Sequence, residues 1–158
     1  LSLYDLNESV QLSVTGPEEP SDESNDGPLI AELTPAEQEV YDMFKADLDI
    51  EHLINLDPIS IARLYSYAGI EGVYEVEYAL YSQNNSQMTK EKHIAIPVND
   101  RGKKEEKIKM YNHIREGTFI QTNNVDGYIT FNMDNFEMSF RLEKNDDGNW
   151  LVSFLPIQ

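Results

Sequence analysis

The chain has 158 residues, 40% of them hydrophobic, which is enough to bury one core. Its 29 acidic and 12 basic side chains give a formal charge of -17, so the phosphate backbone of a nucleic acid would be repelled. The sequence contains no cysteine, which excludes disulfides, thiolate metal sites and a cysteine nucleophile, and it contains no apolar run of about 18 residues that could span a bilayer.

Residues 1–33 are predicted to be a mostly flexible acidic arm and linker. They carry eight of the acids and none of the bases. Residues 16–28 hold three prolines and two glycines among acids and serines, a composition that buries too little apolar surface to offset its ordering entropy. Residues 10–15 alternate in polarity and suit either an edge strand or no order. Because the chain starts at Leu1 without methionine, we expect a preceding segment, such as an anchor or a signal.

A first helix is predicted to begin after Thr34, because Thr34 can cap it, Pro35 suits the first helical position and Glu37 completes a capping box. Its apolar stripe is followed by one or two amphipathic turns in residues 50–56. Asp57 and Pro58 then give a second strong start signal.

The second helix should present one apolar face and end at the glycines of residues 69–72. The residues of that face are Ile61, Leu64, Tyr65 and Ala68. Residues 73–82 fit two patterns. A period of two would make them a strand, whereas a period of 3.6 groups Val73, Val76 and Leu80 and continues through Ala79, where the alternation fails. We therefore favour a helix.

Residues 83–102 are polar and are interrupted by Pro97 and Gly102, with a short strand predicted at residues 94–98. Residues 103–116 alternate in charge around a thin apolar stripe, which predicts a peripheral helix on the surface. Gly117 is placed to take the left-handed cap position at its end.

From Thr118 onward the polarity alternates with a period of two, which predicts strands at residues 119–122, 127–132, 136–143 and 150–155. In the third strand, Phe136, Met138, Phe140 and Leu142 should form the dry face. Turn-forming residues at 134–135 and 146–149 predict an antiparallel meander. The fold class is therefore α+β, in which N-terminal helices pack on a curved C-terminal antiparallel sheet within one domain over residues 34–158.

The stretch DPISIARLYSYAGIEGVYEVEYALYS, together with the meander ending in GNWLVSFLPI, resembles the nuclear-transport-factor-like superfamily of cystatin-like α+β cones. It is similar in particular to small extracytoplasmic domains of Gram-positive bacterial lipoproteins and membrane-anchored regulators. The resemblance covers residues 34–158 and implies a curved sheet around a long helix, with a pocket at the open end. That superfamily hosts isomerases, dehydratases, transport adaptors and domains without known activity. The stretch 83–102 departs from its pattern.

Aromatic side chains provide the ligand-binding candidates. The residues expected to line a cavity in the cone are Tyr65, Tyr78, Tyr81, Phe119 and Trp150. No catalytic residue, metal site or cofactor motif is predicted, because the inner strand faces carry no acid. The three histidines, His52, His93 and His113, stand alone in the sequence and are expected on the surface.

The expected function is that of a non-enzymatic binding or regulatory domain, extracytoplasmic and associated with the cell surface through a missing upstream tether. Its partner would be another protein or a small apolar ligand. The alternative is a small-molecule enzyme of the isomerase or dehydratase type that uses the aromatic cavity. A homodimer through the sheet is also expected, because Ile129, Phe131, Leu151 and Leu155 would form an apolar patch on the outer sheet face.

Overall fold

The computed structural model describes residues 30–83 and 88–158, and the account below concerns these residues. They belong almost entirely to one compact unit, Ala31–Gln158. Residues 10–15, which suit either an edge strand or no order, and the predicted linker at residues 16–28 lie outside the described residues.

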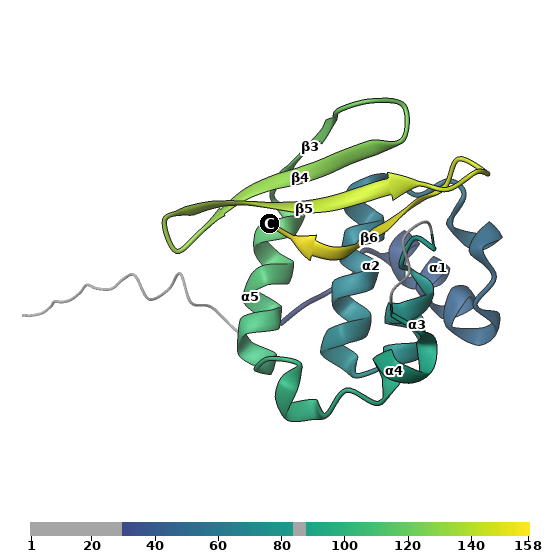
Figure 1. Cartoon of the computed structure of the whole chain (residues 1–158), viewed down its shortest axis with the longest axis horizontal. Coiled ribbons are helices and arrows are strands. Elements are labelled where there is room, and N and C mark those ends of the chain that lie inside the picture. Colours follow the sequence, from purple (N-terminus) through teal and green to yellow (C-terminus); the bar gives the residue numbers. More distant parts are fainter. Residues whose placement is uncertain (1–29, 84–87) are drawn as a thin grey trace, which may run out of the picture. The chain divides into compact units, whose positions relative to one another are not determined.

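The described chain is helical first and then forms a sheet, as the α+β prediction requires (Figure 1). The helical elements are α1 (Pro35–Asp47), η4 (Ile50–Leu53), α2 (Pro58–Glu71), α3 (Tyr74–Ala79), α4 (Lys90–Ile94), η5 (Val98–Asp100) and α5 (Lys104–Arg115). The strands are β3 (Thr118–Gln121), β4 (Asp126–Met133), β5 (Phe136–Lys144) and β6 (Trp150–Ile157).

Both predicted helix starts are confirmed by their caps. The Thr34 hydroxyl accepts from the Glu37 amide at 3.1 Å, and the Glu37 carboxylate accepts from the Thr34 amide at 3.0 Å, which completes the capping box of α1. The Asp57 carboxylate accepts from the Ser60 amide at 2.8 Å at the start of α2. Gly72, with φ of 79°, ends α2 in the left-handed region.

Residues 73–82 follow the helical pattern over most of their length, and no strand forms among them. Tyr74–Ala79 form helix α3, so the helix prediction is confirmed there. Tyr81 then makes an isolated parallel bridge to Val152 of β6. In this bridge the Ser82 amide donates to the Val152 carbonyl at 2.7 Å, and the Val152 amide donates to the Leu80 carbonyl at 2.8 Å.

The strand predicted at residues 94–98 is wrong. Residues 90–94 form α4, because the Thr89 hydroxyl caps them by accepting from the Lys92 amide at 3.2 Å, and residues 98–100 form the short helix η5. Ile94 is therefore the last residue of α4, Val98 is the first residue of η5, and only Ile96 lies between the two helices.

Helix α5 is more deeply packed than predicted, because Ile108, Tyr111 and Ile114 are buried. Gly117 follows it but is not left-handed, so that prediction is also wrong. Glycine is needed there for space: a Cβ would lie 2.6 Å from Ile129 Cγ2 and 2.7 Å from the Thr130 carbonyl oxygen.

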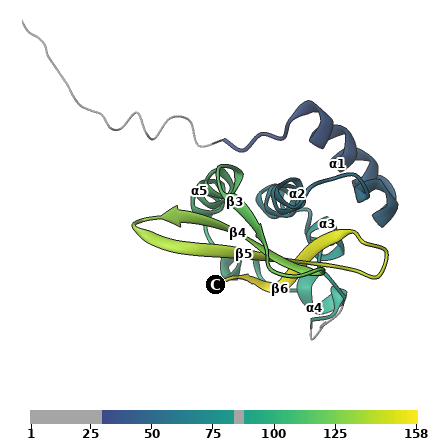
Figure 2. The ribbon, with the colours of Figure 1, turned by 90° about the horizontal axis from the view of Figure 1, so that it is seen from above.

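The sheet is an open antiparallel meander in the order β3-β4-β5-β6, as predicted. Asp134 and Asn135, with φ of 54° and 69°, turn β4 into β5, and Gly148, with φ of 86°, lies in the next turn. Helices α2 and α5 lie side by side against one face of this sheet (Figures 1 and 2).

The predicted apolar patch on the outer sheet face is wrong. Ile129 and Phe131 pair with Phe140 and Met138, and cross-strand partners point to the same face, so these residues enter the core under the helices. Leu151 is also buried in that core, whereas Leu155 is 65% exposed. The prediction of a homodimer through the sheet therefore loses the apolar patch on which it was based.

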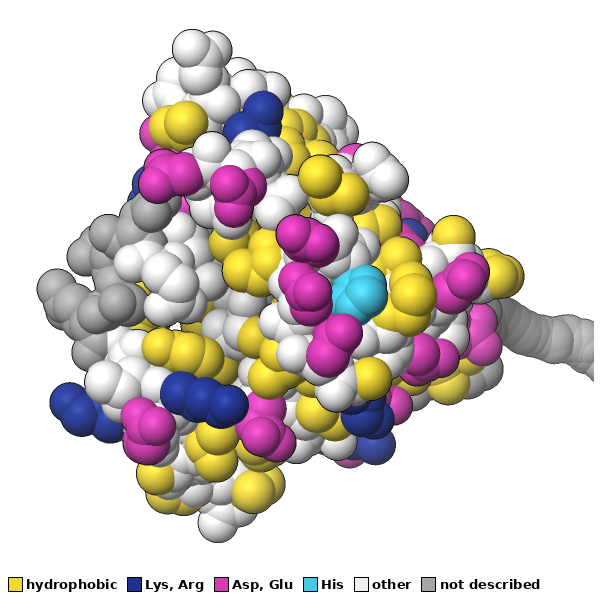
Figure 3. All heavy atoms as spheres, turned by 90° about the vertical axis from the view of Figure 1, so that its right-hand side faces the viewer, with side chains coloured by type: hydrophobic (Ala, Val, Ile, Leu, Met, Phe, Trp, Pro, Cys, Tyr) yellow, Lys and Arg dark blue, Asp and Glu magenta, His cyan; other side chains and the backbone are white. Residues whose placement is uncertain are grey.

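The dry face predicted for β5 is confirmed at Phe140 and Leu142, which are buried, but not at its start. Phe136 is 71% exposed, because it lies at the end of the β4–β5 hairpin. On the face drawn in Figure 3, acidic side chains lie beside a histidine.

Candidate functional site

A cleft of about 400 Å³ opens where α2, α3 and α5 meet the end of β6. In Figure 1 this region lies near the C-terminus, where β6 ends over α2 and α5. Its lining residues are Tyr65, Ser66, Gly69, Glu77, Tyr81, Arg101, Lys107, Met110, Phe140, Leu155, Pro156 and Ile157. The volume falls within the range of about 300 to 1,000 Å³ that is typical of small-molecule sites.

The apolar wall of the cleft is made by Met110 of α5, Phe140 of β5 and the last residues of β6. The pairing of β6 with β5 is irregular here, since it passes from Leu142↔Val152 to Phe140↔Ile157. The intervening residues of β6 bulge, and Leu155 adopts a φ of 53°, which is unusual for a residue with a side chain. This bulge brings residues 155–157 to the cleft.

Two tyrosine hydroxyls provide polar groups in the otherwise apolar wall of the cleft. The hydroxyls of Tyr65 and Tyr81 lie 2.7 Å apart, and the Tyr65 ring also meets the Phe140 ring edge-on with centroids 5.7 Å apart. Burial raises the pKa of both tyrosines above the ordinary value of 10.0, so both hydroxyls stay protonated at neutral pH. One of the two hydroxyls donates its hydrogen to the other oxygen, which leaves the second hydroxyl hydrogen for donation to a ligand.

A charged cluster borders the same cleft. Glu77 Oε1 lies 2.7 Å from His93 Nε2 and 3.6 Å from Arg101 Nη1. Arg101 also donates to the carbonyls of His93 and Ile96, and its guanidinium lies over the Tyr74 ring, 3.5 Å from the centroid. The Arg101 side chain is only 7% exposed, so these contacts tie the loop after α4 to α3.

Lys107 completes the polar part of the cleft. Its ammonium donates to the Gly69 carbonyl at 3.2 Å. Burial lowers the pKa of Lys107 from 10.5, while the Glu77 carboxylate partly opposes that shift. A Cβ at Gly69 would lie 2.5 Å from Glu77 Oε2, so a side chain there would displace the end of Glu77. The bare backbone of α2 thus lets Glu77 approach the helix.

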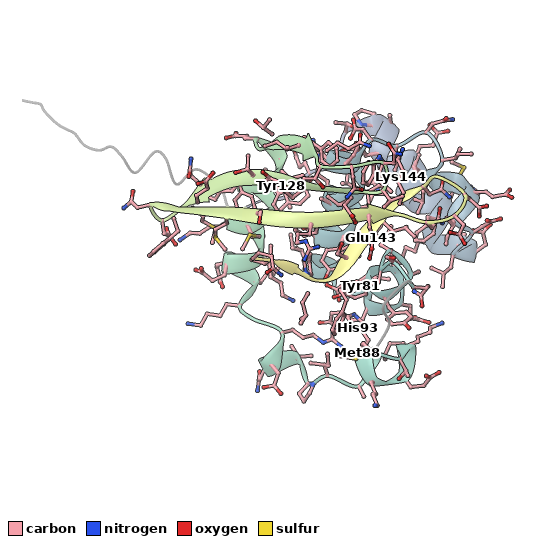
Figure 4. All side chains as sticks on the ribbon, turned by 45° about the horizontal axis from the view of Figure 1, so that its top comes forward. Tyr81, Met88, His93, Tyr128, Glu143 and Lys144 are labelled. Carbon is pink, nitrogen blue, oxygen red and sulfur yellow. The ribbon has the colours of Figure 1, made fainter. Side chains whose placement is uncertain are left out.

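The aromatic candidates from the sequence divide into two groups. Tyr65 and Tyr81 line the cleft, whereas Tyr78 lines a small neighbouring cavity and donates to the Met88 carbonyl at 3.0 Å. Figure 4 shows Tyr81, His93 and Met88 below the ribbon of β6. Phe119 and Trp150 meet edge-on with centroids 5.1 Å apart, but neither lines the cleft.

The cleft also holds charged residues that sequence reasoning missed: Glu77, Arg101 and Lys107, with His93 behind Glu77. His93 is 5% exposed and paired, so its prediction as an isolated surface histidine is wrong. Its polar neighbours in the chain suggested exposure. One signal was present, because Tyr74 and Glu77 are three residues apart in a stretch predicted to be helical and therefore share a helical face.

Comparison of the chain with protein-family models, with curated proteins and with solved structures finds no match. Within residues 30–83 and 88–158, no group of three or more metal-ligating side chains could hold an ion. No helix of that described part is long and apolar enough to cross a membrane.

Proposed function

We propose that the folded unit is a non-enzymatic binding domain that takes a small apolar ligand into the cleft between α2, α5 and β6. The observation that carries this proposal is the composition of the cleft: an apolar wall from Met110, Phe140 and residues 155–157 faces the hydroxyls of Tyr65 and Tyr81. Apolar pockets with a few fixed polar groups are the usual form of a small-molecule site.

The charged groups of the cleft favour binding over catalysis. Arg101 uses its donors on backbone carbonyls and Glu77, and Glu77 Oε1 receives both His93 and Arg101. Oε1 of Glu77 is thereby occupied by two partners from the protein itself. The cluster therefore serves to hold α3 and the loop after α4 in place around the ligand.

The proposal is tested by titrating the protein with octanol and with octanoate while amide chemical shifts are recorded by NMR. Binding in the cleft should shift the amides of Ser66, Gly69 and Ile157. Ser66→Trp should abolish binding by filling the cleft, whereas Ile120→Trp places the same indole at an exposed position of β3 and should leave binding unchanged. If neither compound shifts these amides, the cleft is not an apolar ligand site.

A second candidate is an enzyme of the isomerase or dehydratase type, and the contact between Glu77 and His93 beside the tyrosine pair favours it. Glu77 would remove a proton next to a carbonyl, and a tyrosine hydroxyl would donate to the resulting oxyanion. A β,γ-unsaturated ketone tests this chemistry, because the double bond becomes conjugated when the proton returns to the γ carbon. Conversion that is lost in Glu77→Gln would favour the enzyme, whereas conversion equal to that in buffer favours the binding domain.

We further propose an extracytoplasmic, surface-associated setting in which residues 16–28 act as a spacer between a membrane tether and the folded unit. The acidic, proline-containing composition of these residues supports it. Protease added outside intact cells that express the full-length gene product should cleave the protein. Protection from the protease until the cells are lysed would contradict this setting.

A further inference from the structure

We infer that the ligand of this cleft carries a carboxylate on its apolar body, and that Lys107 and the tyrosine pair hold that carboxylate. The inference rests on the proposed function and names the chemical class of its ligand. It starts from the charges that border the cleft and from the hydrogen bonds that those charges already make.

The charge balance of the cleft leaves one cation in excess. Arg101 and Glu77 form an ion pair at 3.6 Å and offset each other, and His93 adds positive charge whenever it is protonated. Lys107 then remains, half-buried at the cleft wall. A cationic ligand would be repelled, whereas an anion would neutralise the excess. This local surplus stands out in a chain whose formal charge is -17.

Lys107 makes one hydrogen bond to α2, and its ammonium also lies 6.0 Å from the centroid of the Tyr74 ring. The Gly69 carbonyl that it reaches at 3.2 Å already accepts from the Gly72 amide at 3.3 Å, so the end of α2 has a backbone partner without it. An ammonium has three donors, and the Gly69 carbonyl takes one of them. A carboxylate oxygen in the cleft could accept another.

The second carboxylate oxygen has a donor on the same wall. Tyr65 and Gly69 are separated by one turn of α2, so the tyrosine pair and Lys107 are arranged along one side of the cleft. The hydroxyl hydrogen that the Tyr65–Tyr81 contact does not use can be donated to an anion. Hydrogen bonds to a charged acceptor are about twice as strong as neutral ones, so this arrangement should select a carboxylate over an alcohol.

The apolar body would then lie against Met110, Phe140, Pro156 and Ile157, which line the remainder of the cleft. Burying this body supplies affinity that depends little on the head group. The head group can therefore be varied while the body is kept constant, which separates the two parts of the recognition.

The decisive experiment compares octanoate, octanol and octylammonium by calorimetric titration of the full chain. We expect octanoate to bind about 10- to 100-fold more tightly than octanol, and octylammonium to bind most weakly. Equal affinities for octanoate and octanol, or tighter binding of octylammonium, would overturn the carboxylate inference while leaving an apolar ligand site in place. If none of the three compounds binds, the proposed function itself fails.

Variants assign the effect to Lys107. Lys107→Met should weaken octanoate about 10- to 100-fold and leave octanol almost unchanged, because only the charged contact is lost. Lys109→Met removes an exposed lysine of the same helix and should change neither affinity. An equal loss for both compounds in Lys107→Met, or no loss for octanoate, would contradict the assignment. The head-group series on the unaltered protein remains a test even if a variant folds poorly.

Discussion

Tyr41 combines a buried ring with a hydroxyl that donates to Glu71 Oε1 at 2.9 Å. Burial raises the pKa of Tyr41 far above its ordinary value of 10.0, and the nearby Glu71 carboxylate acts in the same direction. Tyr65, Tyr81 and Tyr111 also have pKa values raised by burial. These residues make the native state sensitive to alkaline solution.

We predict that the free energy of unfolding falls as the pH rises above about 10. In this range the unfolded tyrosines release protons that the native tyrosines keep. The native state then binds more protons than the unfolded state, and stability must fall with pH. Below that pH both states are protonated at these tyrosines, so they add no pH dependence.

Urea unfolding of wild type, Tyr41→Phe and the control Tyr128→Phe across this pH range measures the effect. Tyr41→Phe should cost about 1 kcal/mol at neutral pH, from the lost hydrogen bond, and should reduce the alkaline slope. An unchanged slope in Tyr41→Phe would show that Tyr41 does not contribute to the alkaline loss of stability.

At the scale of elements, Glu37 does more than cap a helix. Its carboxylate accepts from the Thr34 amide at 3.0 Å and from the Ser60 hydroxyl at 2.7 Å, and it pairs with Arg63 at 3.0 Å. Ser60 and Arg63 belong to α2, so one buried carboxylate joins the start of α1 to the next helix.

We therefore predict that Glu37→Ala lowers the free energy of unfolding by about 3 to 5 kcal/mol, because it leaves the Arg63 guanidinium, whose side chain is only 12% exposed, without its carboxylate partner. Asp57→Ala removes the exposed cap of α2 and should cost only about 1 kcal/mol. Chemical denaturation of both variants provides the comparison. Similar losses in the two variants would mean that Glu37 acts as a cap alone.

The sequence predicts these elements well where the cause is local. Caps such as Thr34 and Asp57, and turns such as Asp134-Asn135, depend on neighbouring residues and are visible in the chain. The alternation of residues 94–98 does not form a strand, because the Thr89 hydroxyl caps residues 90–94 as a helix. The prediction that Ile129 lies on the outer face of β4 was wrong for another reason. The side to which Ile129 points is decided by the pairing of β4 with β5, which is not visible in the sequence of β4 alone.

The cleft was only partly predictable, because it depends on the whole fold. Tyr65 and Tyr81 could be named from their aromatic character and helical spacing. Glu77, His93 and Arg101 come from α3, α4 and a loop, and only tertiary packing brings them together. No pattern within residues 83–102 indicates that His93 is buried, since burial is set by elements that are distant in the sequence.

For the whole molecule, we predict that the folded unit is stable without residues 1–28. The unit begins at Ala31, and the Glu32 carbonyl accepts from Tyr111 at 2.6 Å and from Arg63 at 3.2 Å. A chain that starts at Leu29 keeps both bonds and should melt cooperatively, with a stability change below about 1 kcal/mol. Loss of cooperative melting would show that the arm belongs to the core.

A chain that starts at Thr34 is the matched comparison. It removes the Glu32 carbonyl and leaves the buried Tyr111 hydroxyl without that acceptor, so it should lose about 1 to 3 kcal/mol relative to the chain that starts at Leu29. Thermal unfolding followed by circular dichroism measures both. Equal stability of the two chains would show that the Glu32 contacts contribute little.

Both edges of the sheet offer little backbone for pairing with another chain. β3, at one edge, has only four residues. At the other edge, the bridge from Tyr81 covers Val152, and beyond it Leu155 distorts the backbone while Pro156 offers no amide hydrogen. A strand from another copy would therefore find few backbone groups arranged for pairing at either edge, which opposes the growth of intermolecular β-structure even in concentrated solution.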